Sequence, residues 1–199
     1  MEKIIVATKN QGKLEEIKEI LADLPYMILS LKDVGLQVEI EEDQNTFEGN
    51  ALKKAAEVMK LTGEIALADD SGLEVEALDK KPGVYSARFA GENATDEENN
   101  KKLLELMKDV PDHKRKAVFR CAIAMVFPDG RIIQVDGSCP GKIGYEERGT
   151  GGFGYDPLFI VDGLNKTFAE LDAEQKNQIS HRGLALKKLK EMLTVLGQE

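Results

Sequence analysis

The sequence has few cysteines and no long apolar run. Its two cysteines, Cys121 and Cys139, lie in strand-like segments and lack the spacing of metal ligands. We therefore expect both to be reduced packing residues of a cytoplasmic protein. The first apolar run, residues 4–7, is too short for a signal peptide, and no run approaches the roughly 18 apolar residues of a transmembrane helix. We expect no membrane partner.

Positive charge is also in short supply. The chain carries 27 lysines and arginines against 36 aspartates and glutamates, which gives a net charge of −9. Such a surface repels nucleic acids and anionic membranes, so we expect no nucleic-acid polymer among the partners. A small anionic substrate is still compatible with this charge, provided that a few basic side chains converge at one place.

No internal repeat or low-complexity linker divides the 199 residues, and this length fits one domain over 1–199 with room for a smaller lobe. Two helix starts carry capping signals, Asn45 with Glu48 and Thr95 with Glu98. Apolar periodicity predicts strands over residues 3–7, 26–31, 65–68, 73–78, 117–127, 131–138 and 158–161, and helices around residues 14–24, 47–59, 95–107 and 186–196. Strands and helices mix without strict alternation, which indicates an α/β fold around a mixed sheet.

A glycine-rich stretch, GTGGFGYDP, occupies residues 149–157. Gly149, Gly151 and Gly154 reproduce the G-x-G-x-x-G spacing of a dinucleotide-binding loop. That fingerprint works only where a strand leads into a helix, because the pyrophosphate lies on the helix N-terminus. Here Pro157 and a strand-like run follow instead of a helix. We therefore reject a nicotinamide or flavin site; on local grounds the alternative is a flexible hairpin loop.

The first strand-to-helix junction, Thr8–Lys13, is a better phosphate-binding candidate. Its backbone amides and the positive end of the helix dipole would face a docked anion. It is not a Walker A loop, because Ala7 stands where the first glycine would be and Leu14 replaces the magnesium-binding serine or threonine. A plain turn with surface lysines is the alternative interpretation.

Carboxylates gather at two further places. Asp69 and Asp70 follow a buried strand-like run, where open α/β sheets place their sites, and an acidic loop contains Glu41 and Glu42. Adjacent side chains on a strand point to opposite faces, so only one aspartate should face the site. Carboxylate oxygens suit Mg²⁺ that is shared with substrate phosphates. The alternatives are a turn or helix cap for the aspartates and a solvated surface for the loop.

A third polar cluster is the segment KNQISHRG at residues 176–183. It gathers a cation, amide donors, a hydroxyl, an imidazole and a guanidinium in a short stretch of chain. A surface helix start with a serine cap is the alternative. The other histidine, His113, lies in a polar loop, and we expect it to be exposed to solvent.

Five motifs occur together in this order: ATKNQGK at 7–13, ADDSGL at 68–73, PGVYSARF at 82–89, GTGGFGYDPLF at 149–159 and SHRG at 180–183. Through them the chain resembles the inosine triphosphate pyrophosphatase family, the house-cleaning nucleoside triphosphatases that remove deaminated purines. The resemblance spans nearly the whole chain. It implies a two-lobed α/β fold, with a long, mixed, twisted β-sheet flanked by helices and an active-site cleft between the lobes.

The resemblance also implies an activity. Family members hydrolyse ITP, dITP and XTP to the monophosphate and pyrophosphate, need Mg²⁺ and are typically homodimers. We therefore expect a Mg²⁺-dependent pyrophosphatase that keeps deaminated purine nucleotides out of nucleic acid. Two alternatives remain: a pyrophosphatase for other nucleotides such as dTTP or UTP, and a nucleotide-sensing module that does not hydrolyse its ligand.

Carried over residue by residue, the resemblance makes Asp70 the base that activates water and Glu42 its partner in holding the metal. The sequence does not decide which residue of two adjacent pairs faces the site: Glu41 or Glu42 for the metal, and Lys53 or Lys54 for the phosphates. Thr8–Lys13 would hold the triphosphate, and Lys54 would help to neutralise its charge. The nucleoside would be surrounded by residues 153–156, Lys176, His181 and Arg182. The full set assigned to substrate binding is Thr8, Lys9, Asn10, Gln11, Gly12, Lys13, Lys54, Ser71, Phe153, Gly154, Tyr155, Asp156, Lys176, His181 and Arg182.

Overall fold

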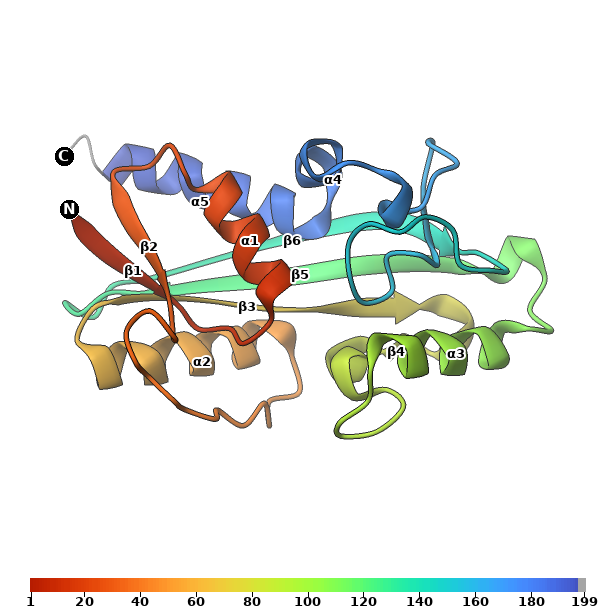
Figure 1. The fold of residues 1–199 in the computed structure, drawn as a ribbon, viewed down its shortest axis with the longest axis horizontal. Coiled ribbons are helices and arrows are strands. Elements are labelled where there is room, and N and C mark those ends of the chain that lie inside the picture. The colour runs from red at the N-terminus through yellow and green to blue at the C-terminus, as the bar shows by residue number, and fades with distance from the viewer. Residues whose placement is uncertain (197–199) are drawn as a thin grey trace. The chain divides into compact units, whose positions relative to one another are not determined.

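The computed structural model describes residues 1–196, so residues 197–199 of the predicted domain lie outside the described part (Figure 1). The strands are β1 (Glu2–Val6), β2 (Tyr26–Ser30), β3 (Ile65–Val75), β4 (Lys81–Pro82), β5 (Lys116–Val126), β6 (Ile132–Ile143) and β7 (Phe159–Val161). The helices are α1 (Gln11–Ile20), α2 (Phe47–Thr62), α3 (Asp96–Met107), α4 (Ala173–Ile179) and α5 (His181–Leu196). This mixture of elements confirms the α/β prediction.

Within residues 1–196, seven strands form one mixed sheet in the order β2-β1-β3-β5-β6-β7, with β4 paired to β3. β1 runs parallel to β2 and β3, whereas β4 is antiparallel to β3 and β7 to β6. A tight turn joins β5 to β6: the Phe127 N–H donates to the Arg131 carbonyl, and the Gly130 N–H donates to the Phe127 carbonyl, both at 3.0 Å. The predicted mixed sheet is therefore confirmed.

The chain forms two compact units. Among the described residues, unit 1 contains Met1–Asp70, Cys121–Gly137 and 182–196, and unit 2 contains Ser71–Arg120 and Ser138–His181. Strands β3, β5 and β6 contribute residues to both units. The residues that the sequence assigns to the site also belong to both units. Arg182 and those before Ser71 belong to unit 1, and Ser71, residues 153–156, Lys176 and His181 belong to unit 2.

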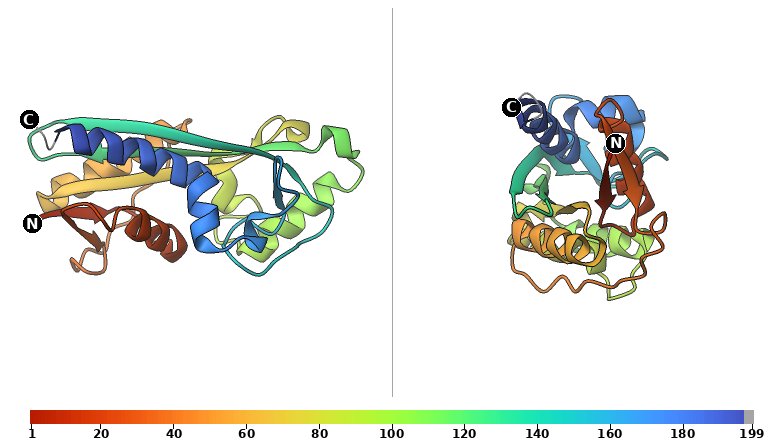
Figure 2. Two further views of the ribbon diagram at one scale, coloured as in Figure 1. Left: turned by 90° about the horizontal axis from the view of Figure 1, so that it is seen from above. Right: turned by 90° about the vertical axis from the view of Figure 1, so that its left-hand side faces the viewer.

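In unit 1, helices cover both faces of the sheet. Helices α1 and α5 lie on one face and α2 lies on the other (Figures 1 and 2). Ile4 and Val6 of β1 pack with α1 and α5 in one apolar cluster, and strand alternation directs the fully buried Ile5 to the opposite face. This packing on both sides fixes the end of β1, from which the Thr8–Lys13 loop emerges.

Unit 2 has an apolar cluster of its own. Three of its rings, Phe119, Phe159 and Phe168, contact one another with centroids 4.7 to 5.6 Å apart. Tyr155 and Leu158 from the glycine-rich stretch are buried in the same cluster. The cluster therefore anchors the end of that stretch at the point where the chain enters β7.

Strand β3 differs from the sequence prediction. The sequence separates a strand over 65–68 from another over 73–78, but one strand, Ile65–Val75, runs through the whole segment and ends in a 3₁₀ turn at Glu76–Leu78. Asp69 and Asp70 consequently lie inside a strand rather than in a turn. Their side chains are held by the sheet, with the alternating directions that a strand imposes.

The helix starts are partly as predicted. The capping box of Thr95 and Glu98 is present at the start of α3, which confirms that prediction. The Asn45 cap is wrong, because α2 is capped by Thr46, whose side chain accepts a hydrogen bond from the Gly49 N–H at 3.1 Å.

Both cysteines are buried and unbridged, as the sequence predicts. Burial raises the pKa of the Cys121 thiol to about 12, which keeps it protonated and unreactive. Among the described residues, no helix has the length and apolar character needed to cross a membrane.

Candidate functional site

The Thr8–Lys13 loop has the geometry that the sequence predicts for it. It leaves β1 and enters α1, with Asn10 as the N-cap. The Asn10 side chain accepts from the Lys13 N–H at 3.0 Å, and the Thr8 hydroxyl accepts from the Asn10 N–H at 3.1 Å. These bonds hold the loop in a fixed shape, and the remaining amides of the helix start are available to an anion.

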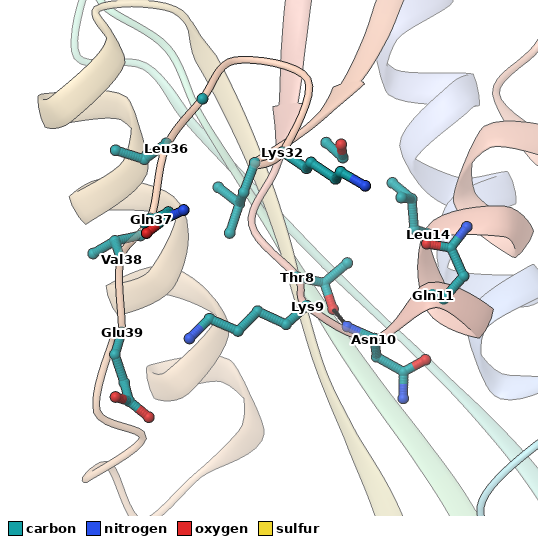
Figure 3. A pocket seen from close by; sticks show the side chains of 13 residues that line it. Thr8, Lys9, Asn10, Gln11, Leu14, Lys32, Leu36, Gln37, Val38 and Glu39 are labelled. Atoms are coloured by element: carbon teal, nitrogen blue, oxygen red, sulfur yellow. Dashed lines mark hydrogen bonds between the residues drawn. The ribbon is translucent and has the colours of Figure 1, made fainter.

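A cavity of about 640 Å³ adjoins this loop in unit 1. Loop residues 8–11 line one side of it, and residues 30–32 and 35–39, at the end of β2 and after it, line the other. Lys9 extends into it from the loop, and Lys32 lies on the opposite wall (Figure 3). A cavity of this size with basic side chains and helix-start amides suits a polyanionic chain such as a triphosphate.

Asp69 is a buried carboxylate of β3 in unit 1. Its Oδ2 lies 3.2 Å from the Lys13 ammonium and accepts from Arg182 through Nε at 3.1 Å and Nη2 at 2.9 Å. Burial alone raises the pKa of Asp69, but the Lys13 and Arg182 cations outweigh it and hold that pKa well below its usual range. Asp69 therefore stays ionised and orients Lys13 at the start of α1.

Asp70 has different neighbours, as the alternation of β3 requires. Its Oδ2 accepts a hydrogen bond from the Asn50 side chain of α2 at 2.9 Å. Burial raises the pKa of Asp70 and the nearby Glu42 carboxylate adds to this, while the Lys54 and Lys13 cations oppose it. An aspartate with a raised pKa, held by one directed amide, is suited to accept a proton. The sequence reasoning did not find Asn50.

The structure distinguishes between the two registers that the sequence left open. Lys54 is nearly buried; its ammonium binds the Glu42 carboxylate and also donates to the Asp69 carbonyl at 2.7 Å. Lys53 instead pairs with the exposed Asp43, 2.9 Å away. Glu41 is exposed. The geometry therefore places Glu42 and Lys54, rather than their neighbours, beside Asp70.

Glu42 and Asp70 offer a donor set for a hard cation. They are two carboxylates close enough for Glu42 to raise the pKa of Asp70, and a divalent cation would offset that repulsion. In the described part of the chain, no group of three or more histidine, cysteine, aspartate or glutamate side chains could hold a metal ion. Two carboxylates leave positions for water and substrate oxygens, which is how Mg²⁺ is commonly bound.

A second group of predicted residues lies in unit 2, around the glycine-rich stretch. Asp156 is buried, and its Oδ2 accepts from the Phe153 N–H at 3.0 Å and from the Lys176 ammonium at 2.6 Å. Lys176 also lies over the Phe153 ring, 4.6 Å from its centroid. Gly152 has a φ of +71°, and a Cβ there would lie 2.0 Å from Asp156 Oδ2, so only glycine fits.

Other predicted residues have structural contacts. The Tyr155 hydroxyl donates to the Ser86 carbonyl at 2.7 Å inside the core of unit 2, and burial raises the pKa of Tyr155. His181 is buried and stacks on Phe119 with ring centroids 4.6 Å apart. Ser71 is half-buried in β3, directly after Asp70. Their substrate contacts stay predictions.

Arg182 belongs to unit 1, although it follows His181 directly in sequence. Besides Asp69 it binds Glu16 of α1 through Nη1, and the three side chains are buried together. These contacts give Arg182 a structural role in unit 1. Its assignment to the nucleoside stays a prediction.

Comparison with known proteins decides the family. The profile of the Ham1 family matches residues 4–192, nearly the whole chain. The chain belongs to the Ham1 family.

Two similar proteins are named for an enzymatic activity. A dITP/XTP pyrophosphatase of Desulforamulus reducens is 55% identical over 194 residues, which cover 98% of this chain and 96% of the relative. Another dITP/XTP pyrophosphatase, of Geobacter sulfurreducens, is 55% identical over 199 residues and the full length of both chains. These matches confirm the resemblance on which the sequence analysis relied.

Solved structures agree with the fold. A HAM1 protein from Coxiella burnetii superposes with a TM-score of 0.88 at 44% identity, covering 98% of this chain and 99% of that one. A nucleoside-triphosphatase named dITP/XTP pyrophosphatase from Mycobacterium abscessus gives 0.76 at 44% identity, covering 94% and 98%. The predicted fold class is therefore confirmed for this Ham1 protein.

Proposed function

We propose that this Ham1 protein is a Mg²⁺-dependent pyrophosphatase that hydrolyses dITP, ITP and XTP to the monophosphate and pyrophosphate, and so keeps deaminated purines out of nucleic acid. The observation that carries the proposal is the cluster in unit 1, where the anion-binding loop, two lysines and two carboxylates occur together. The names of relatives that are 55% identical over nearly their full length support the same activity.

The triphosphate binds the Thr8–Lys13 loop in this proposal. The start of α1 and the Lys9 side chain approach the phosphate oxygens, because residues 8–11 line the cavity and Lys9 extends into it (Figure 3). Lys13 and Lys54 neutralise further phosphate charge while Asp69 keeps them in place, through its carboxylate for Lys13 and its carbonyl for Lys54. Positioning and neutralisation of charge supply most of the catalysis in phosphoryl transfer.

Glu42 and Asp70 would hold the Mg²⁺, since two adjacent carboxylates fit the oxygen preference of that ion. When bound, the ion withdraws charge from the phosphate oxygens. Asp70 accepts the proton of the water that attacks the α-phosphorus, and Asn50 fixes the direction of its carboxylate. Lys54 holds Glu42 in position from α2.

The base is recognised through its 6-oxo group. Hypoxanthine and xanthine present an acceptor where adenine presents a donor, so donors from His181, Arg182 or the backbone would be left unpaired against adenine. A site of this kind discriminates by about 10⁴-fold. Phe153 stacks on the base, which adds about 1–3 kcal/mol without distinguishing one base from another. The 2-amino group of guanine is excluded by shape or by an unmet donor.

A cytoplasmic location and a homodimer belong to the same proposal, and both rest on the resemblance to the family. A nucleotide sensor is a weaker candidate, because a site that only binds an anion gains nothing from the Glu42 and Asp70 carboxylates. A pyrophosphatase for dTTP or UTP would use the same phosphate chemistry and differ only at the base.

The experiment that tests the proposal measures pyrophosphate release from dITP, ITP, XTP, dTTP, UTP, GTP and ATP, each with and without Mg²⁺. We expect fast release from the first three and only with Mg²⁺. Faster turnover of dTTP or UTP would support the pyrimidine alternative. Binding of any of these nucleotides without release would support the sensor.

A further inference from the structure

Two side chains of α3 hold both backbone polar groups of Gly154. The Gly154 N–H donates to Asp96 Oδ2 at 2.7 Å, and the Gly154 carbonyl accepts from Asn100 Nδ2 at 3.0 Å. Asp96 and Asn100 are four residues apart and therefore lie on the same face of the helix. The capping box of Thr95 and Glu98 fixes the helix start from which they project.

These contacts act on Phe153. The Gly154 N–H belongs to the peptide group that follows Phe153, and the N–H of Phe153, in the preceding peptide group, donates to Asp156 at 3.0 Å. With both flanking peptide groups held, the backbone angles of Phe153 have little freedom. The direction of the Phe153 Cα–Cβ bond, from which the ring projects, is thereby set by α3 on one side and by Asp156 on the other.

Asn100 is buried, and one polar atom of its side-chain amide is paired within the described chain. The residue is 3% exposed, and its Oδ1 has no hydrogen-bond partner within residues 1–196. A buried carbonyl oxygen without a partner destabilises a protein, so the useful atom of this side chain is the donor Nδ2 rather than Oδ1. The bond to Gly154 is therefore the contact through which Asn100 acts on the backbone beside Phe153.

We propose that Asp96 and Asn100 are positioning residues that place the Phe153 ring for stacking on the purine and thereby set the affinity for the base. This inference rests on the proposed function, in which Phe153 contacts the base. Asp70 and Glu42, which are assigned to the chemistry, keep their own partners when α3 is altered. Loss of the bonds from α3 therefore raises KM for dITP and leaves kcat nearly unchanged.

Four variants test the inference. Asp96→Ala and Asn100→Leu each remove one bond to Gly154, whereas Asp96→Asn keeps an oxygen that accepts from the Gly154 N–H. Glu97→Gln, in the same exposed turn of α3, controls for the loss of negative charge at the helix start. KM and kcat for dITP and the thermal unfolding midpoint are measured for each variant and for the unmodified protein.

We expect Asp96→Ala and Asn100→Leu to raise KM by about tenfold, with kcat within about twofold of the unmodified value. Asp96→Asn and Glu97→Gln should keep both constants. Asn100→Leu removes the unpaired Oδ1 but also leaves the Gly154 carbonyl without its donor, so the two effects on the unfolding midpoint oppose each other. A rise in KM at constant kcat that Asp96→Asn does not show is the result that a merely structural role would not produce.

An unchanged KM for Asp96→Ala and Asn100→Leu, in a protein that hydrolyses dITP, overturns the inference and leaves the proposed function intact. A fall in kcat with KM unchanged also overturns it. Because Asp96 is exposed, Asp96→Ala decides the question even where Asn100→Leu does not fold. An unmodified protein without activity on dITP overturns the proposed function, and the inference with it.

Discussion

Arg182 donates two hydrogen bonds to one oxygen of Asp69, from Nε at 3.1 Å and from Nη2 at 2.9 Å. Both side chains are buried, and Glu16 accepts from the remaining Nη1. Burial by itself lowers the pKa of Arg182, but Asp69 and Glu16 outweigh it and raise that pKa. Arg182 thus links the start of α5 to β3 and to α1 within unit 1. The Asp69 carboxylate also binds the Lys13 ammonium and so positions it.

Replacing Arg182 with methionine should destabilise the protein strongly. The change removes the guanidinium from the buried Asp69 and Glu16 carboxylates, although Asp69 keeps Lys13, and breaking a buried pair in this way costs about 3–5 kcal/mol. Lys188→Met on the same helix removes an exposed ion pair with Asp136 and should cost less than about 1 kcal/mol. Urea unfolding of both variants measures the difference. Equal stabilities would contradict the role given to Arg182.

The pKa of Asp69 predicts a pH dependence of stability. Burial would raise the pKa of Asp69, but Lys13 and Arg182 lower it in the folded protein. As the pH falls, Asp69 is therefore protonated at a higher pH in the unfolded chain than in the folded one. The stability from Asp69 is therefore complete above the ordinary aspartate pKa of about 3.9 and is lost as the pH falls below it. In Asp69→Asn, the free energy of unfolding should fall less steeply between about pH 5 and pH 2. Parallel curves for the two proteins would contradict this prediction.

Asp70→Asn should abolish turnover and spare binding. The amide keeps the shape of the carboxylate but cannot accept the proton of water, so we expect kcat for dITP to fall by about 10²–10⁴-fold. The dissociation constant for dITP, measured by calorimetry, should change far less. Asp43→Asn, an exposed carboxylate on the nearby acidic loop, is the matched control and should keep full activity. A near-normal rate in Asp70→Asn would refute the role of Asp70 as base.

Glu42 and Glu41 provide a matched pair for the metal. Glu42 binds Lys54 beside Asp70, whereas Glu41 is exposed. Glu42→Gln should raise the Mg²⁺ concentration needed for half-maximal activity by at least about tenfold, and Glu41→Gln should leave it unchanged. Activity measured over a Mg²⁺ titration gives both values. The opposite order would show that the register of the acidic loop is wrong.

Local patterns in the sequence predicted most of the elements and the strand–loop–helix order around Thr8–Lys13, because these depend on neighbouring residues, but they missed α4 and divided β3 in two. Periodicity and the capping box at Thr95 are of this kind, and so is the strand–loop–helix order around Thr8. Partners that are distant in sequence were not predictable in the same way. Asn50 lies 20 residues from Asp70, and Arg182 lies 113 residues from Asp69. Only the folded chain brings such pairs together.

The resemblance to the family supplied the roles that local patterns could not. It selected Asp70 over Asp69 and Glu42 over Glu41, and the geometry is consistent with both choices, since Asn50 and Lys54 direct these carboxylates. It also assigned Tyr155 to substrate binding, whereas the Tyr155 hydroxyl donates to the Ser86 carbonyl inside the core of unit 2. The active-site cleft between two lobes stays a prediction.

The central claim is that water, activated by Asp70, attacks the α-phosphorus of a deaminated purine triphosphate. The most direct test is hydrolysis of dITP in water enriched in a heavy oxygen isotope, with mass analysis of both products. We predict that the heavy oxygen enters dIMP and that unlabelled pyrophosphate is released. Label in the pyrophosphate, or release of inorganic phosphate with dIDP, would contradict the account.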